Sequence, residues 1–149
     1  MVNNLYTLQQ KIYSCKRCHL SKTAKSAVPG EGNPNNQIMF IGEAPGKVED
    51  ETGRPFVGRA GRLLNTLIDS INLKRELVFI TNVVKHRPSD DIVAYGRRSR
   101  SPKNRQPKKT ELKACSLWLD YQLSFIKPKL VITLGRFALD IFFPKKKFL

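Results

Sequence analysis

Residues 37–61 read QIMFIGEAPGKVEDETGRPFVGRAG, and this stretch decides the fold class. The apolar run at residues 38–41 predicts a buried β-strand. A loop with five glycines and two prolines follows between residues 42 and 61. Residues 59–71 then carry apolar side chains at helical spacing, which predicts one helical face made of Leu63, Leu64, Leu67 and Ile71.

The alternation of strands and helices continues on both sides of this stretch. Apolar spacing predicts helices over 4–14, 107–127 and 136–143, and strands over 77–82 (LVFITN) and 129–134 (KLVITL). We therefore expect one α/β domain over residues 1–149, a three-layer α/β/α fold with a central parallel sheet. Such sheets bind ligands beyond the carboxyl ends of their strands, where the loops after Gly42 and Asn82 meet.

The charge of the chain points to a polyanionic partner. Lys and Arg total 27 and Asp and Glu total 12, which gives a formal net charge of +15. An anionic membrane surface is the competing partner, but no basic amphipathic helix with a clean apolar face is present. There is also no membrane-spanning apolar run and no signal-peptide core. We therefore expect a cytoplasmic protein, and three cysteines in a reducing compartment argue against a disulfide framework. We also expect a monomer.

Basic residues gather in a loop that interrupts the second half of the chain. The segment DIVAYGRRSRSPK lies between Pro88 and Asn104, and we expect a flexible basic insertion over about 89–103. Arg97, Arg98 and Arg100 are predicted to contact the DNA backbone. The alternative is a solvated loop without a partner.

The long loop after the first strand favours a pocket over a phosphate cradle. It lacks the Lys-Ser/Thr pair of a P-loop and the spacing of a dinucleotide-binding motif, and its acids would repel phosphate. Acidic residues beside Phe56 suit a pocket for a flat polar ring. An unusually long turn without a ligand is the plain alternative.

The loop motif, followed by TNVVKHRP at residues 81–88, resembles the paired signature of family-four uracil-DNA glycosylases. The resemblance implies a uracil-DNA glycosylase acting on uracil in single- or double-stranded DNA. Catalytic roles fall on Glu43, near the sugar and its water, and on Asn82, which reads the uracil edge. Uracil-binding roles fall on Ala44, through its N–H, on Glu49, which helps to close the pocket, and on Phe56, which stacks on the flipped base.

The resemblance also implies a metal centre. Cys15 and Cys18 form a Cys-x-x-Cys pair, and Cys115 matches the last of the four cysteines that hold a 4Fe-4S iron–sulfur cluster in the family. His86 stands where the family has the third cysteine. Three cysteines and one histidine are also a common zinc set, so zinc is the alternative to the cluster. Unliganded cysteines are the remaining possibility.

Family members continue past the strand at 129–134 with a further strand and a motif that carries a catalytic-site histidine. The sequence ends at Leu149 without either, so it resembles a C-terminally truncated member, and we expect weak or absent uracil excision. A non-catalytic DNA-binding protein that keeps an iron–sulfur or zinc site is the alternative function. A nucleotide-handling Rossmann-like protein is the third, and no phosphate-binding signature supports it.

Overall fold

The structure is a computed structural model that describes residues 3–89 and 103–144. Within these residues one sheet has the strand order β1-β3-β2-β4. The strands are β1 (Glu31–Gly32), β2 (Ile38–Gly42), β3 (Phe79–Asn82) and β4 (Leu130–Thr133). The central strand β2 pairs in parallel with β3 and β4, whereas β1 pairs antiparallel with β3.

The α/β fold class is confirmed, and the sheet is parallel at its centre but antiparallel at the β1 edge. This strand has two residues and contains a glycine. It lies in a stretch rich in Pro, Gly and Asn, so no apolar alternation reveals it in the sequence. The strand exists only through its tertiary pairing with β3, in which Glu31 lies opposite Ile80.

The described helices include the four that apolar spacing predicts and several short ones that it does not. The helices are α1 (Leu5–Tyr13), α2 (Leu20–Thr23), α3 (Lys47–Thr52), α4 (Arg59–Ser70), α5 (Lys109–Ile126) and α6 (Arg136–Phe142). Two 3₁₀ turns, η1 (Pro34–Asn36) and η2 (Arg75–Leu77), precede β2 and β3.

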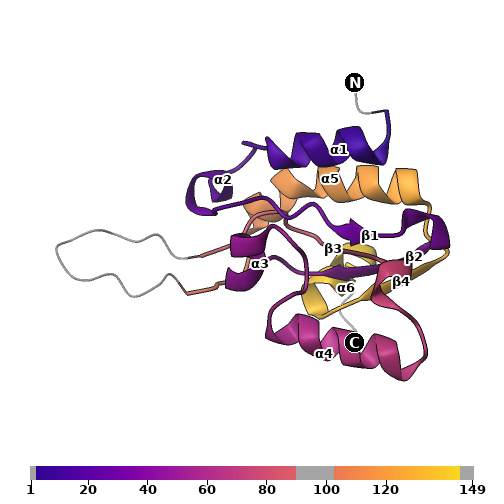
Figure 1. The fold of residues 1–149 in the computed structure, drawn as a ribbon. Helices are drawn as coiled ribbons and strands as arrows, with labels where there is room; N and C mark the ends of the chain where they lie inside the picture. The colour runs from indigo at the N-terminus through magenta and orange to yellow at the C-terminus, as the bar shows by residue number, and fades with distance from the viewer. Residues whose placement is uncertain (1–2, 90–102, 145–149) are drawn as a thin grey trace, which may run out of the picture.

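Helices cover both faces of the sheet, as Figure 1 shows with α1 and α5 on one side and α4 on the other. Met39 and Ile41 of β2 pack into the core cluster that also contains residues of α1, α5 and α6. Phe40, between them, points to the opposite face and packs with Leu64 and Ile68 of α4. This alternation along a single strand confirms the three-layer α/β/α arrangement.

The predicted apolar face of α4 was only partly right. Leu64 is buried as expected, but Leu63, Leu67 and Ile71 are 62%, 56% and 66% exposed. Gly61, in the first turn of the helix, lies directly against the main chain of the preceding loop. Leu64 and Ile68 share its helical face and are buried against the sheet, whereas Leu63 and Leu67 lie on another face.

The segment between Gly46 and Gly58, expected as loop, contains the six-residue helix α3. Val48 is its one apolar residue, so the sequence carries no helical periodicity there. The signals are local instead. The carboxylate of Glu49 accepts a hydrogen bond from the N–H of Gly46 at 3.1 Å, and Gly53 ends the helix with a left-handed φ of +71°.

Candidate active site

The candidate site lies at the carboxyl ends of β2 and β3. Gly42 and Asn82, the last residues of the two strands, are paired in register. The pairing continues beyond them, because the N–H of Val83 donates to the Gly42 carbonyl at 2.8 Å and the N–H of Val84 to the Glu43 carbonyl at 3.0 Å. The two loops therefore leave the sheet side by side, as the sequence predicts.

Phe56 and Asn82 converge over Gly42. A Cβ placed on Gly42 would lie 2.3 Å from Cζ of Phe56 and 2.5 Å from Oδ1 of Asn82. Only a residue without a side chain leaves room for both groups at this point. A loop residue and a strand-end residue, 26 positions apart, thus meet above a glycine to which the sequence analysis assigned no role.

Asn82 presents an acceptor that lacks a partner. The residue is 1% exposed, and its Oδ1 is a buried atom without a hydrogen bond among the described residues. A buried polar atom left bare costs about 1–3 kcal/mol. Asn82 also lines a cavity of about 390 Å³ together with Ala44, Glu49 and Phe56. The site is therefore suited to a flat ligand that stacks on the Phe56 ring and donates a hydrogen bond to Asn82.

Glu49 holds the loop that carries Phe56. Its Oε1 accepts hydrogen bonds from the N–H groups of Val57 at 3.0 Å and Gly58 at 2.7 Å, and its Oε2 accepts one from Gly46 at 3.1 Å. The carboxylate thus joins both ends of the segment 46–58. Although Glu49 lines the cavity, the bonds that the structure shows are all to the loop backbone.

Phe56 has a main-chain conformation that is uncommon for its residue type. Its φ is +49°, in the left-handed region, where a non-glycine residue costs roughly 1–2 kcal/mol. The surrounding structure holds it there. A Cβ on Gly61 would lie 1.9 Å from the Phe56 carbonyl oxygen, so the first turn of α4 lies directly against this main chain. The Arg75 guanidinium donates to the same carbonyl at 3.0 Å.

Glu43 and Ala44 follow Gly42 directly and are partly buried. Burial raises the pKa of the Glu43 carboxyl above its ordinary value of 4.5. The cavity lining also includes Lys47 and Arg59, two cations that the sequence interpretation did not single out, and Asn104, which accepts a hydrogen bond from Nε of Arg87 at 2.7 Å.

The three cysteines come together between α1, α2 and α5. Burial raises the pKa of the Cys115 thiol to about 11; the charge of Lys85 opposes this shift, and the neighbouring Cys15 and Cys18 add to it. Two of the sulfurs accept hydrogen bonds at 3.2 Å, Cys115 from the N–H of Lys85 and Cys15 from Nε1 of Trp118. Such N–H donors stabilise a thiolate that binds a metal.

His86 lies close to a carboxylate. It is 5% exposed, and burial lowers its pKa while the negative charge of Asp50 opposes that shift. Over residues 3–89 and 103–144, no group of three or more His, Cys, Asp or Glu side chains is arranged to hold a metal ion. The three cysteines are thus gathered in one region, but among the described residues they do not form a coordination shell with His86.

Lys85 joins the cysteine region to the candidate pocket, and the sequence interpretation did not foresee this. Its main chain contacts Cys115, and its fully buried Nζ donates to the Asn82 carbonyl oxygen at 2.6 Å and to Oε1 of Gln122 at 2.6 Å. Burial lowers the pKa of Lys85 from 10.5 to about 7. The sequence around Lys85 suggests a surface residue, because lysine is seldom buried, and its burial arises from tertiary contacts with β3, α5 and Val28.

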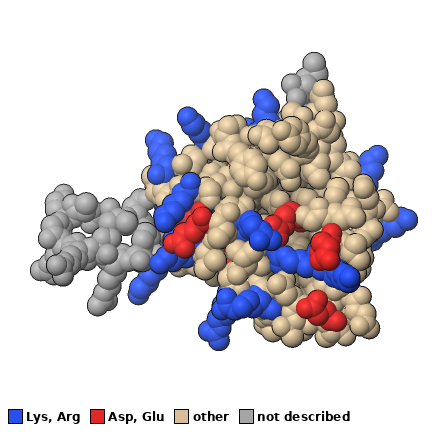
Figure 2. All heavy atoms as spheres, in the orientation of Figure 1, with Lys and Arg blue, Asp and Glu red and all other residues tan. Residues whose placement is uncertain are grey.

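The predicted DNA contacts Arg97, Arg98 and Arg100 lie outside the described residues. The base of their segment is described: Ser89 and Asn104 form an antiparallel bridge, and the N–H of Arg105 donates to the Pro88 carbonyl at 3.1 Å. Figure 2 shows Lys and Arg side chains around much of the outline of the visible face, with the acidic side chains among them. In the described part of the chain, none of the helices has the length and apolar character needed to cross a membrane.

The fold and the pocket define an α/β protein with a cavity beyond the carboxyl ends of two parallel strands. Residues 29–148 match the family model of the uracil DNA glycosylase superfamily, and the chain belongs to that superfamily.

Three relatives narrow the similarity. The chain is 46% identical over 145 residues to a type-4 uracil-DNA glycosylase of Sulfurisphaera tokodaii, covering 97% of the chain and 60% of the relative. It is 47% identical over 145 residues to the protein of that name from Saccharolobus solfataricus, covering 97% and 61%. For the Archaeoglobus fulgidus protein the identity is 43% over 142 residues, covering 95% and 65%. The resemblance to family-four glycosylases is confirmed, and the chain spans less than two thirds of the length of these relatives.

Proposed function

We propose that this chain hydrolyses the N-glycosidic bond of deoxyuridine in single- or double-stranded DNA, as the first step of base excision repair. The observation that carries the proposal is the bare, buried Oδ1 of Asn82 facing the ring of Phe56 across Gly42. A flat ring in the cavity that both residues line would stack on Phe56 and offer an N–H to this oxygen. The relatives named type-4 uracil-DNA glycosylase favour this activity over the non-catalytic DNA-binding alternative.

In the proposed complex the target base is flipped out of the stack into the cavity. Phe56 stacks on the uracil ring, which is worth about 1–3 kcal/mol. Oδ1 of Asn82 accepts from the uracil N–H, its amide group donates to a uracil carbonyl, and the N–H of Ala44 donates to another. Cytosine would oppose Asn82 with one mismatched group, a cost of about 1–3 kcal/mol.

Glu43 acts on the sugar. In hydrolysis the bond between the sugar carbon and the base nitrogen breaks, uracil leaves with the electron pair, and water supplies the new oxygen. A carboxylate beside the sugar orients that water and stabilises the positive charge that develops on the ring. Glu49 keeps the Phe56 loop closed around the base through its three backbone contacts.

A metal centre held by Cys15, Cys18, Cys115 and His86 forms the second part of the proposal, with a 4Fe-4S cluster as the group and zinc as the alternative. The clustering of the thiols and the N–H groups that point at two of them support it. When bound, the group would tie α1, α2 and α5 together and has no part in the hydrolysis. Lys85 then links that region to Asn82.

The third part concerns the partner. We propose that Arg97, Arg98 and Arg100 contact DNA phosphates without reading bases, and that the protein acts as a cytoplasmic monomer with a single domain. Replacing the three arginines by glutamine should weaken binding to all DNA sequences about equally and reduce the salt dependence of binding. A loss confined to uracil-containing DNA would contradict this role.

Single-turnover excision from a single-stranded oligonucleotide with one deoxyuridine tests the function. The chain is compared with the same chain extended by the C-terminal segment of a relative, because the relatives are longer. Asn82→Ala should reduce the rate at least about 100-fold in whichever form is active, since it removes both hydrogen bonds to the base. Asn35→Ala, at an exposed asparagine in η1, is the matched control and should leave the rate unchanged. No excision by either form would overturn the proposal.

Anaerobic purification followed by iron, sulfide and zinc analysis tests the metal centre without reference to activity. A bound cluster gives iron and acid-labile sulfide together with visible absorbance, and Cys15→Ala should abolish both. Stoichiometric zinc without sulfide would replace the cluster by its alternative. Protein free of all three would remove the metal proposal.

A further inference from the structure

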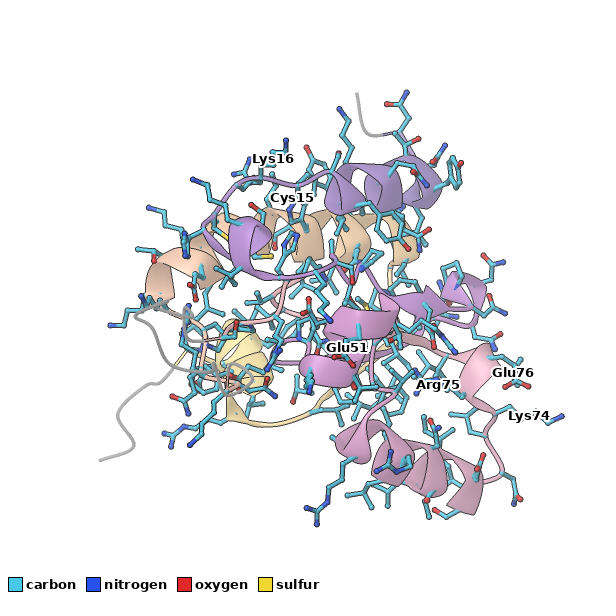
Figure 3. The ribbon with its side chains drawn as sticks, turned by 60° about the vertical axis from the view of Figure 1, so that its left-hand side comes forward. Cys15, Lys16, Glu51, Lys74, Arg75 and Glu76 are labelled. Atoms are coloured by element: carbon cyan, nitrogen blue, oxygen red, sulfur yellow. The ribbon has the colours of Figure 1, made fainter. Side chains whose placement is uncertain are left out.

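Arg75 lies between the α3–α4 loop and the strand that carries Asn82. It is the first residue of η2, four residues ahead of the start of β3. Figure 3 shows Lys74 and Glu76 on the outer side of this turn and Arg75 on the side of the α3–α4 loop. Its side chain is 18% exposed, whereas its two neighbours are exposed residues. Arginine side chains are seldom buried unless they are paired, so the contacts of Arg75 explain its inward position.

The guanidinium of Arg75 contacts the main chain of the Phe56 loop at two successive carbonyls. Nη1 donates to the Phe56 carbonyl at 3.0 Å and Nη2 to the Pro55 carbonyl at 2.5 Å. Nη1 also donates to Oδ1 of Asn65 in α4 at 2.8 Å. One side chain thus fixes the carbonyl on each side of the Phe56 N–Cα bond, the bond whose rotation defines φ.

Glu31 fixes the guanidinium in turn. Its Oε1 accepts from Nη2 of Arg75 at 2.9 Å and from Nε at 3.3 Å. Burial raises the pKa of Glu31, but the hydrogen bonds and charges of Arg54 and Arg75 outweigh this, and its pKa lies below the ordinary value. Glu31 is therefore ionised at neutral pH. It sits in β1, the antiparallel edge strand, which gives this short strand a role in the site.

We propose that Arg75 is a positioning residue for the excision of uracil. It holds Phe56 in its left-handed conformation and thereby sets the aromatic ring opposite the Asn82 amide. The assignment rests on the proposed function for its catalytic consequence. Its conformational part depends only on the contacts described above. Arg75 does not line the cavity, so it acts through Phe56 and not on the base.

Arg75→Lys is the main variant, because lysine keeps the charge beside Glu31 but lacks the planar fork that reaches two carbonyls and a carboxylate together. Arg54→Lys is the matched control. Arg54 binds the same carboxylate, at 2.8 Å and 3.1 Å, with a side chain that is 61% exposed. Both variants keep the charge near Glu31, so a difference between them reports on the loop carbonyls.

The first measurement is made on the free protein. The Cα chemical shift of Phe56 and its three-bond HN–Hα coupling, recorded by NMR on labelled protein, depend on its backbone torsions, and the coupling depends on φ. Arg75→Lys should move both values away from the left-handed range, and Arg54→Lys should leave them in place. Unchanged Phe56 values in a folded Arg75→Lys protein would overturn the proposal. If Arg75→Lys does not fold, Glu31→Gln, which loosens the guanidinium and leaves Arg75 in place, takes its role in the comparison.

The second measurement is single-turnover excision in two backgrounds. With Phe56 present, Arg75→Lys should slow the reaction about 10- to 100-fold, because a misplaced platform loses productive geometry. In a Phe56→Ala background the same change should have an effect of less than about twofold, since the two residues act as one unit. Equal losses in both backgrounds would mean that Arg75 only stabilises the fold. The excision is measured in whichever form, unmodified or C-terminally extended, is active. Absence of excision by both forms would refute the proposed function, while the NMR result would still decide the role of Arg75.

Discussion

Replacing Gly42 by alanine tests the convergence of Phe56 and Asn82 with the addition of one methyl group. The new Cβ would lie 2.3 Å from Cζ and 2.7 Å from Cε2 of Phe56, and 2.5 Å from Oδ1 of Asn82. The closest of these contacts is roughly 1.2 Å shorter than the distance at which carbon atoms pack. The methyl group therefore enters the space where the ring and the amide meet. Because alanine has no side-chain rotamers, only movement of Phe56 or Asn82 can relieve the overlap.

The expected outcome has a small thermodynamic part and a large kinetic part. Overpacking of this kind costs about 1–3 kcal/mol of unfolding free energy, because the ring can swing toward the cavity. A displacement of about 1 Å at a reacting site lowers the rate about 100-fold. We thus expect a moderate shift in the denaturant midpoint and a single-turnover excision rate about 100-fold below that of the unmodified protein, with unchanged binding to undamaged DNA.

Gly42→Ala in a Phe56→Ala background provides the control. Removing the ring relieves two of the three close contacts, so the added methyl should then destabilise the protein much less. Wild-type stability together with a wild-type excision rate in the single variant would show that the ring and the amide do not meet over Gly42. The pocket assignment would then be wrong.

Three further predictions concern Gly61, Glu43 and Glu31. Gly61→Ala should destabilise the protein by more than about 2 kcal/mol in chemical denaturation, although alanine is the better helix former by about 1 kcal/mol, because its Cβ would lie 1.9 Å from the Phe56 carbonyl oxygen; a stabilised variant would contradict the observed contact. The excision rate should fall on acidification with a pKa above 4.5, because burial raises the pKa of Glu43 and only the carboxylate is active; a Glu43→Gln protein that retains this acid limb would exclude Glu43 as its source. Glu31 has a lowered pKa, so its contribution to stability is complete above its ordinary value of 4.5 and is lost as the pH falls through the lower folded value. Glu31→Gln should remove that part of the acid dependence in thermal melts, and an identical pH profile would refute it.

The sequence determined the elements whose apolar residues recur with a regular period. Residues 38–41, with hydrophobic side chains throughout, became the central strand β2, and the periodic segments became α1, α4, α5 and α6. It also placed Phe56 in the loop after this strand and Asn82 at the end of the next strand, because both motifs are continuous stretches of sequence. These features depend on neighbours within a few residues, which a linear sequence displays.

Only the tertiary structure decided how the site is held together. The left-handed φ of Phe56, its support by Arg75 and the burial of Lys85 each depend on residues that are distant in the chain. The same holds for β1, whose two residues become a strand only by pairing with β3. Such contacts leave no periodic pattern and no local composition in the sequence, because each joins groups on elements that are far apart in the chain. Their energy depends on distance and burial in three dimensions, and neither quantity exists before the chain has folded.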